Sequence, residues 1–259
     1  MSSKMVIKAL SLLDAFTVEN PSWGLRDLSR EVGLSHTVVH RLLKSFVESG
    51  YIFQNPETKK YELGIKFIEL SNVVEEKLQI YDWINPILEK VGSETGESVV
   101  LTILDNNEGA FVKIVESGKS IKFGESVGRR SPLYVGASHK VILAHLPQEV
   151  QDTIIDQGLE KQSEYIGSRE SFSEKLQHIK NKGWFYTAGE TYNDVAAISI
   201  PLFDRKEYVL GSLSVAGPAF RLTEEHAIKM LPILKESQRE INKIFSKVIF
   251  PSRRDHLIN

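Results

Sequence analysis

The sequence predicts an α+β protein in two parts, a small helical part that ends in a β-hairpin and a larger part built on one antiparallel sheet. Three observations predict this class. Apolar residues recur at helical three- and four-residue steps through the first fifty residues. The pattern changes to the alternation of a hairpin between Tyr51 and Leu63. Beyond Gly96, apolar runs of strand length alternate with helical stretches, as expected for an α+β fold.

Length and composition are those of an ordinary globular protein with room for two domains. The 259 residues are 41% hydrophobic and 25% charged, with a formal net charge of -2. The absence of cysteine excludes disulfides, thiolate catalysis and cysteine-based metal sites, and it fits a reducing cytosol. No apolar run approaches the roughly 20 residues that span a bilayer.

The N-terminal stretch MSSKMVIKALSLLDAF predicts the first helix. A signal peptide is the alternative, but Lys8, Ser11 and Asp14 interrupt the apolar residues and no small-residue cleavage site follows. We therefore expect an amphipathic helix in a cytoplasmic protein that has no contact with a membrane. The helix ends before the loop ENPSWG. Its apolar positions are Val6, Ala9, Leu10, Leu12, Leu13 and Phe16.

A helix-turn-helix is predicted next. The stretch RDLSREVG forms a short helix, and Gly33 is positioned to end it in a left-handed turn. Ser35 is a suitable N-cap for the following helix. A helix, a tight glycine turn and a second helix present that second helix to the major groove of DNA. The apolar face of the second helix consists of Val39, Leu42, Leu43, Phe46 and Val47.

A β-hairpin follows the helix-turn-helix. The segments YIFQ and KKYEL flank the turn NPET, in which Pro56 fits the first central position. Lys59 and Lys60 lie near the tip, where they suit contact with phosphate. A hairpin in this place is the wing of a winged helix-turn-helix.

The polar face of the second helix and the hairpin lysines are the predicted contacts with DNA. Arg41 can bind guanine with two hydrogen bonds, and Lys44, further along the helix, suits a phosphate. The alternative is a face that is simply exposed to solvent. The glycine turn, the basic hairpin and a charge balance of +2 over residues 1–66, against -4 over the rest, favour DNA. The predicted DNA-binding residues are Arg26, Ser35, His36, Thr37, His40, Arg41, Lys44, Lys59 and Lys60.

A connecting helix is predicted between the two parts, from the apolar residues Ile65, Ile68, Val73 and Leu78, and Pro86 interrupts or begins the next helix. We expect a DNA-binding domain at residues 1–66, a linker helix at 67–80 and a second domain at 81–259.

The second part contains five predicted strands. Three come first, at residues 98–105, 109–117 and 120–126, and two come later, at 195–203 and 208–217. Helices lie between the two groups, and a final helix is predicted from Thr223, a favoured N-cap residue type, to Val248. We expect one mostly antiparallel sheet.

The two later strands each have one bulky face and one small, mildly polar face. Leu213 and Val215 alternate with Ser212, Ser214 and Ala216. The strand before them alternates in the same way, with Val195, Ala197 and Ser199 opposite Ala196, Ile198 and Ile200. A small face beside hydroxyls leaves room for a small polar ligand. Close packing against a helix backbone is the alternative.

The whole chain resembles the IclR-type bacterial transcription regulators. The N-terminal match is LSHTVVHRLLKSFVESGYI followed by KKYELG. The C-terminal matches are PLYVGASHKVILAHL, KGWFYTAGETYNDVAAISIPLFD and GSLSVAGPAFRLTEE. The resemblance implies a GAF-like effector-binding domain, a homodimer or tetramer on a near-palindromic operator, and a small-molecule effector. Repression is the commoner outcome in the family.

The resemblance also implies which residues bind the effector, commonly an organic or aromatic acid. A helix N-terminus near Ser138 would suit a carboxylate. Thr187, Ala197 and Tyr134 differ from better-understood members, so the identity of the effector stays open. The implied effector-binding residues are Phe123, Ser131, Ala137, Ser138, Thr187, Val195, Ala197, Ser214 and Ala216.

Two alternatives to this function are consistent with parts of the sequence. An enzyme is disfavoured because His139 and His145 are six residues apart and no HExxH motif, nucleophile elbow or P-loop is present, so we expect no catalysis, metal or cofactor. Glu190, in AGETYND, is assigned a structural or ligand-orienting role. The other alternative is a DNA-binding regulator whose second domain serves only for assembly, with no effector.

Overall fold

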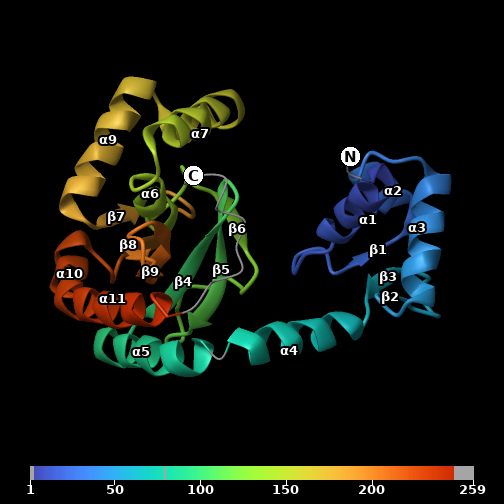
Figure 1. Ribbon diagram of the computed structural model, residues 1–259, viewed down its shortest axis with the longest axis horizontal. Helices are drawn as coiled ribbons and strands as arrows, with labels where there is room; N and C mark the ends of the chain where they lie inside the picture. The colour runs from blue at the N-terminus through green and yellow to red at the C-terminus, as the bar shows by residue number, and fades with distance from the viewer. Residues whose placement is uncertain (1–2, 79, 248–259) are drawn as a thin grey trace. The chain divides into compact units, whose positions relative to one another are not determined.

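The computed structural model describes residues 3–78 and 80–247 (Figure 1). The chain divides into two compact units between residues 79 and 80. Within the described ranges, no helix has the length and apolar character needed to cross a membrane.

The first unit contains a helix-turn-helix and a three-stranded sheet. Gly33, which has a φ of 63°, makes the predicted left-handed turn between the two helices. Ile52 pairs with Leu63 and Gln54 with Tyr61, which confirms the hairpin. The elements are α1 Lys4–Asp14, β1 Ser22–Trp23, α2 Leu25–Glu31, α3 His36–Glu48, β2 Ile52–Gln54, β3 Tyr61–Leu63 and α4 Lys66–Leu78.

The core of the first unit is smaller than the apolar pattern of α1 predicts. Leu12 of α1, Leu28 of α2 and Leu43 of α3 are fully buried together. Val6 and Leu10, in contrast, are 55% and 54% exposed, so the predicted apolar face of α1 is only partly covered within this unit.

Two local predictions in the first unit need correction. Ser22–Trp23, predicted as loop, forms strand β1, which pairs with β3. Trp23 Nε1 donates a hydrogen bond to Ala15 O at 2.9 Å, and this contact from outside the segment holds the short strand in place. Ser35 is the N-cap residue of α3, as predicted, but its side chain makes no capping hydrogen bond.

The helix after α4 also differs from the prediction. α5, Ile80–Thr95, continues through Pro86, which neither begins nor interrupts it. Ile84 and Leu88, on either side of Pro86, are fully buried, and this burial outweighs the loss of one backbone hydrogen bond.

The second unit is built on one antiparallel sheet, which confirms the α+β class. The strand order is β6-β5-β4-β9-β8-β7, and every neighbouring pair is antiparallel. The strands are β4 Ser98–Asp105, β5 Glu108–Val115, β6 Arg130–Pro132, β7 Phe185–Ala188, β8 Val195–Phe203 and β9 Val209–Pro218.

Helices cover both faces of this sheet. Figure 1 shows α5 and α11 together on one face and α6, α7 and α9 on the other. Val100, Ser214 and Ser199 are register partners across three strands, and Ser212 Oγ donates to Ser138 O of α6, so the small face lies toward α6 as a continuous surface. The helices are α6 Ala137–Leu143, α7 Gln148–Lys161, α8 Ser163–Ile166, α9 Arg169–Lys182, α10 Glu224–Lys229 and α11 Leu231–Phe245.

The predicted strand at residues 120–126 is wrong, and Phe123 lies in a loop. The edge of β5 is paired instead with β6, where Gly109 faces Ser131. Phe111 N additionally donates to Arg129 O at 2.9 Å. β6 pairs with β5 at Glu108–Ala110, and residues 121–126 are not part of a strand.

The predicted final helix is two helices. Thr223 is the N-cap of α10, and its side chain accepts from His226 N, as a cap should. The break falls at Met230, because the ring of Pro232 conflicts with the carbonyl of the residue four positions earlier in a continuous helix. The predicted end of the helix, Val248, lies outside the described residues.

Candidate functional site

The first candidate site is the polar face of α3 with the neighbouring hairpin. Val39, Leu42 and Leu43 face the core and fix the rotation of α3. The opposite side of the helix is therefore left in solvent. All nine predicted DNA-binding residues are exposed: Arg26, Ser35, His36, Thr37, His40, Arg41, Lys44, Lys59 and Lys60.

The cations on this surface are weakly engaged within their own chain. Lys44 Nζ lies 3.8 Å from Glu48 Oε1, and both side chains are largely exposed. An exposed pair of this kind contributes little stability. No ion-pair partner is present for Arg41 among the residues of known placement. These charges are available to an anionic partner.

The hairpin tip is ordered by hydrogen bonds between the Asn55 side chain and the backbone. Asn55 Oδ1 accepts hydrogen bonds from the backbone N–H groups of Glu57 and Thr58 at 3.0 and 3.1 Å. Lys59 has a φ of 57°, which reverses the chain toward β3. Lys59 and Lys60 are thereby held on an exposed, structured turn.

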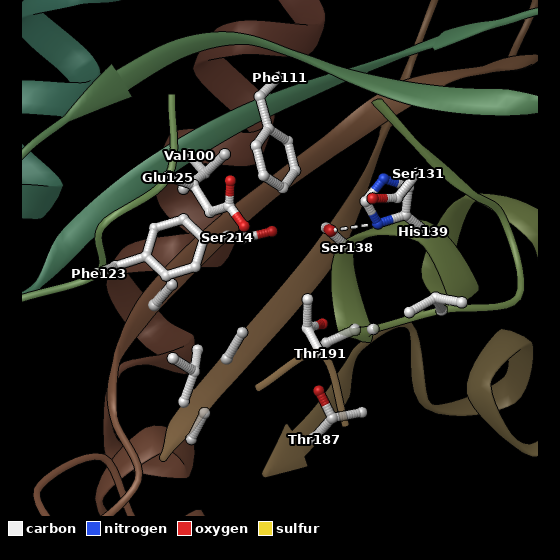
Figure 2. A pocket seen from close by; sticks show the side chains of 17 residues that line it. Val100, Phe111, Phe123, Glu125, Ser131, Ser138, His139, Thr187, Thr191 and Ser214 are labelled. Carbon is white, nitrogen blue, oxygen red and sulfur yellow. Dashed lines mark hydrogen bonds between the residues drawn. The ribbon is translucent and has the colours of Figure 1, made fainter. Parts of the chain in front are cut away.

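The second candidate site is a cavity between α6 and the small face of the sheet (Figure 2). The structure brings all nine predicted effector-binding residues to its wall. Its volume is about 40 Å³, the size of a few water molecules, so a larger ligand requires lining side chains to move. These nine residues are Phe123, Ser131, Ala137, Ser138, Thr187, Val195, Ala197, Ser214 and Ala216.

One wall of the cavity is apolar. Phe111 and Phe123 meet edge to face with ring centroids 6.2 Å apart. Val100 and Ala216 are buried in the same cluster, and Ala197 packs against it. This wall suits the hydrocarbon part of a ligand.

At the start of α6 the cavity is lined by polar groups. Ser138 Oγ lies 2.9 Å from His139 Nδ1, and His139 Nε2 lies 3.3 Å from Gly109 O. Burial lowers the pKa of His139 to about 4, so the imidazole is neutral at pH 7. Gly109 makes this placement possible, since a Cβ there would lie 2.4 Å from Cδ2 of the ring.

An ion pair beside the cavity fixes the loop after β7. The ammonium of Lys140, fully buried, contacts Glu190 Oε1, while Glu190 Oε2 accepts from Gly136 N–H at 2.8 Å. Burial lowers the pKa of Lys140, and Glu190 opposes that shift. Thr191, the next residue of the loop, lines the cavity. Glu190 thus positions the loop, in keeping with the structural role that the sequence predicts.

A carboxylate also lines the cavity. The side chain of Glu125 is 9% exposed, and its Oε2 lies 3.7 Å from Arg129 Nη1. Tyr192 forms a hydrogen bond with Glu125, and this contact raises the pKa of the tyrosine. Glu125 carries the only formal charge among the described lining residues.

The sequence analysis misses part of the lining. Strand alternation could have found Val100 and Phe111, which lie on the small-residue face. His139 and Glu125 carry no such signal, because their place depends on α6 and on a loop. The missed residues are Val100, Phe111, Glu125, Val135, Gly136, His139, Thr191 and Ala196.

Comparisons with known proteins identify the family of both domains. Residues 5–56 match the IclR helix-turn-helix domain, and residues 73–243 match the bacterial transcriptional regulator IclR C-terminal domain. The HTH-type transcriptional regulator KipR of Bacillus subtilis is 30% identical over 243 residues, covering 93% of this chain and 96% of KipR. The transcriptional repressor IclR of Escherichia coli is 21% identical over 238 residues, covering 90% and 87%.

A solved structure shares the fold. An IclR homologue from Microbacterium hydrocarbonoxydans, complexed with 4-hydroxybenzoate, has a TM-score of 0.78 at 20% identity and covers 95% of this chain and 100% of its own. The two matching family domains are those of a DNA-binding transcription regulator and not of an enzyme. The chain belongs to the IclR family of bacterial transcription regulators.

Proposed function

We propose that this regulator is a cytoplasmic repressor whose operator affinity changes when a small organic or aromatic acid binds in the cavity. DNA binding is assigned to residues 1–66, the linker to 67–80 and effector binding to 81–259. The observation that supports this most strongly is the convergence of nine dispersed residues on one cavity, in a different compact unit from the exposed face of α3.

The proposed operator is a near-palindrome bound by a homodimer or a pair of dimers. Two copies of α3 would enter successive major grooves, roughly one helical turn of DNA apart. Apolar side chains of α1 are exposed, among them Val6, Ile7 and Leu10. Their exposure supports a dimer in which a second copy of the chain covers them.

An acid would be held by hydroxyl and N–H groups rather than by an ion pair. In the part of the chain that the structure describes, no lysine or arginine lines the cavity. Ser131 and Thr191 offer hydroxyls, and the first turn of α6 offers backbone N–H groups that have no partner inside the helix. The bound 4-hydroxybenzoate of the Microbacterium relative supports an acid of this size.

The test has two steps. Thermal shift first selects ligands from a panel of small carboxylic and aromatic acids. Fluorescence anisotropy then measures binding of the full chain to its operator with and without each ligand. A ligand of the native state at a hundred times its Kd adds about 2.7 kcal/mol of stability. Ala197→Leu should fill the cavity and remove the response while operator binding persists. Ala188→Leu, on the exposed end of β7, is the matched control and should respond normally.

The alternative hypothesis, in which the second domain serves only for assembly, predicts the opposite result. No acid would then change thermal stability or operator affinity, and Ala197→Leu and Ala188→Leu would behave alike. That outcome would leave DNA binding in place and remove the effector from the proposal.

A further inference from the structure

Resting on the proposed function, we infer that the effector carries a hydroxyl group that donates a hydrogen bond to Glu125. Neither the sequence pattern nor the family resemblance assigns a role to this residue. The inference concerns the end of the cavity formed by Glu125, Phe111 and Phe123.

Glu125 is buried and directed into the cavity. Its side chain is 9% exposed and forms part of the cavity wall. In Figure 2 the carboxylate lies between the rings of Phe111 and Phe123, with its oxygens toward Ser214. The Ser214 hydroxyl is already paired with Ser199 Oγ at 2.7 Å. Glu125 therefore presents oxygen acceptors to the space that a ligand would fill.

The protein leaves much of the acceptor capacity of this carboxylate unused. An ionised carboxylate has about four acceptor positions. Tyr192 uses one, and Arg129 Nη1, at 3.7 Å, is too distant for a hydrogen bond. A buried carboxylate with unused acceptor positions is stabilised by a hydrogen-bond donor, because hydrogen bonds to charged groups are stronger than those between neutral groups.

The charge around Glu125 favours a neutral donor. A second anion at this end would be repelled by the carboxylate. A cation, Arg129, already lies beside Glu125, with Nη1 at 3.7 Å from Oε2. A hydroxyl supplies the missing hydrogen bond without adding charge.

The surroundings also define the rest of the ligand. The body next to this hydroxyl faces Phe111, Phe123 and Val100, and it must be apolar. An acid group belongs at the other end of the cavity, beside Ser138 and Thr191. The inferred effector is thus a hydroxylated acid with an apolar centre, a narrower class than organic or aromatic acids in general.

The experiment compares 4-hydroxyphenylacetate with 4-fluorophenylacetate, which matches it in shape but has no donor. Calorimetric titration of the full-length protein should give a Kd at least about ten-fold lower for the hydroxyl compound. Glu125→Leu should bring the ratio of the two Kd values close to one. Glu125→Gln keeps an acceptor oxygen without the charge and should give an intermediate ratio, which decides the matter if the leucine variant does not fold.

Glu116→Gln is the control, because this exposed carboxylate pairs with Lys122 and does not line the cavity. Its ratio should equal that of the unaltered protein. Equal affinity of the two compounds for the unaltered protein would overturn the inference and leave an acid effector standing. No binding of either compound at millimolar concentration, with no change in operator affinity, would count against both the inference and the proposed function.

Discussion

Each unit of this regulator contains a Lys–Glu ion pair, and the two pairs differ in burial and in their further contacts. Lys44 and Glu48 on α3 are 70% and 65% exposed and 3.8 Å apart. Lys140 is fully buried and contacts Glu190, which also holds Gly136 N–H. The first pair is easily exchanged for a partner in solution, whereas the second fixes the wall of a cavity. The charges of Lys44 and Glu48 are open to solvent, whereas those of Lys140 and Glu190 order the protein interior.

The largest expected effect comes from breaking the buried pair. Glu190→Ala leaves the Lys140 ammonium buried without its partner, which typically costs about 3–5 kcal/mol of unfolding free energy. Urea denaturation of the full chain measures this loss. Glu48→Ala is the matched control on α3 and should cost less than about 1 kcal/mol. Similar losses in the two variants would remove the contrast between the units.

A second test of the interior of the second unit concerns how His139 makes stability depend on pH. Its folded-state pKa, about 4, lies below the unfolded value of 6.5. The unfolded state therefore binds more protons below pH 6.5, and stability should fall as the pH drops from 6.5 to 4, by about 3 kcal/mol at most. His139→Gln should flatten this dependence. His36→Gln, on the exposed face of α3, should keep the slope of the unaltered protein in the same pH-dependent denaturation series.

On the exposed side, Arg41→Ala should weaken binding to the operator by about 1–3 kcal/mol if Arg41 contacts a base. Anisotropy titrations on operator and on random DNA separate the two kinds of contact. The same loss on both sequences would make Arg41 a phosphate contact.

The smallest expected effect concerns the hairpin. Lys59→Ala and Lys60→Ala should each reduce the slope of log K against log salt by about one unit if each lysine contacts one phosphate. Operator titrations at several salt concentrations give the slope. An unaltered slope in both variants would place the hairpin outside the interface with DNA.

The features that the sequence predicts correctly depend on local pattern. The helix-turn-helix, the hairpin and the small face with Ser214 and Ala197 follow from spacing along one segment. The predictions are wrong where a segment distant in the chain determines the local structure. Trp23 forms a strand because β3 lies beside it, and Phe123 lies in a loop although its own segment alternates like a strand.

The same reasoning explains which site residues could be predicted. The resemblance supplies nine cavity residues that the structure brings together. It does not supply Glu125 or His139, whose position depends on contacts with Arg129 and Gly109. A residue in a loop, such as Glu125, and a contact between residues 30 positions apart, such as His139 and Gly109, leave no periodic trace in one sequence.

The small volume of the cavity has a kinetic consequence. With space for only a few water molecules, the cavity can admit a ligand only after side chains or the loop held by Glu190 have opened. Such openings fall on the microsecond-to-second timescale. The observed rate of ligand binding should then level off as ligand concentration rises, at the rate of opening itself. At saturating concentrations of the proposed effector, the response would then be limited by opening of the cavity and not by the amount of ligand.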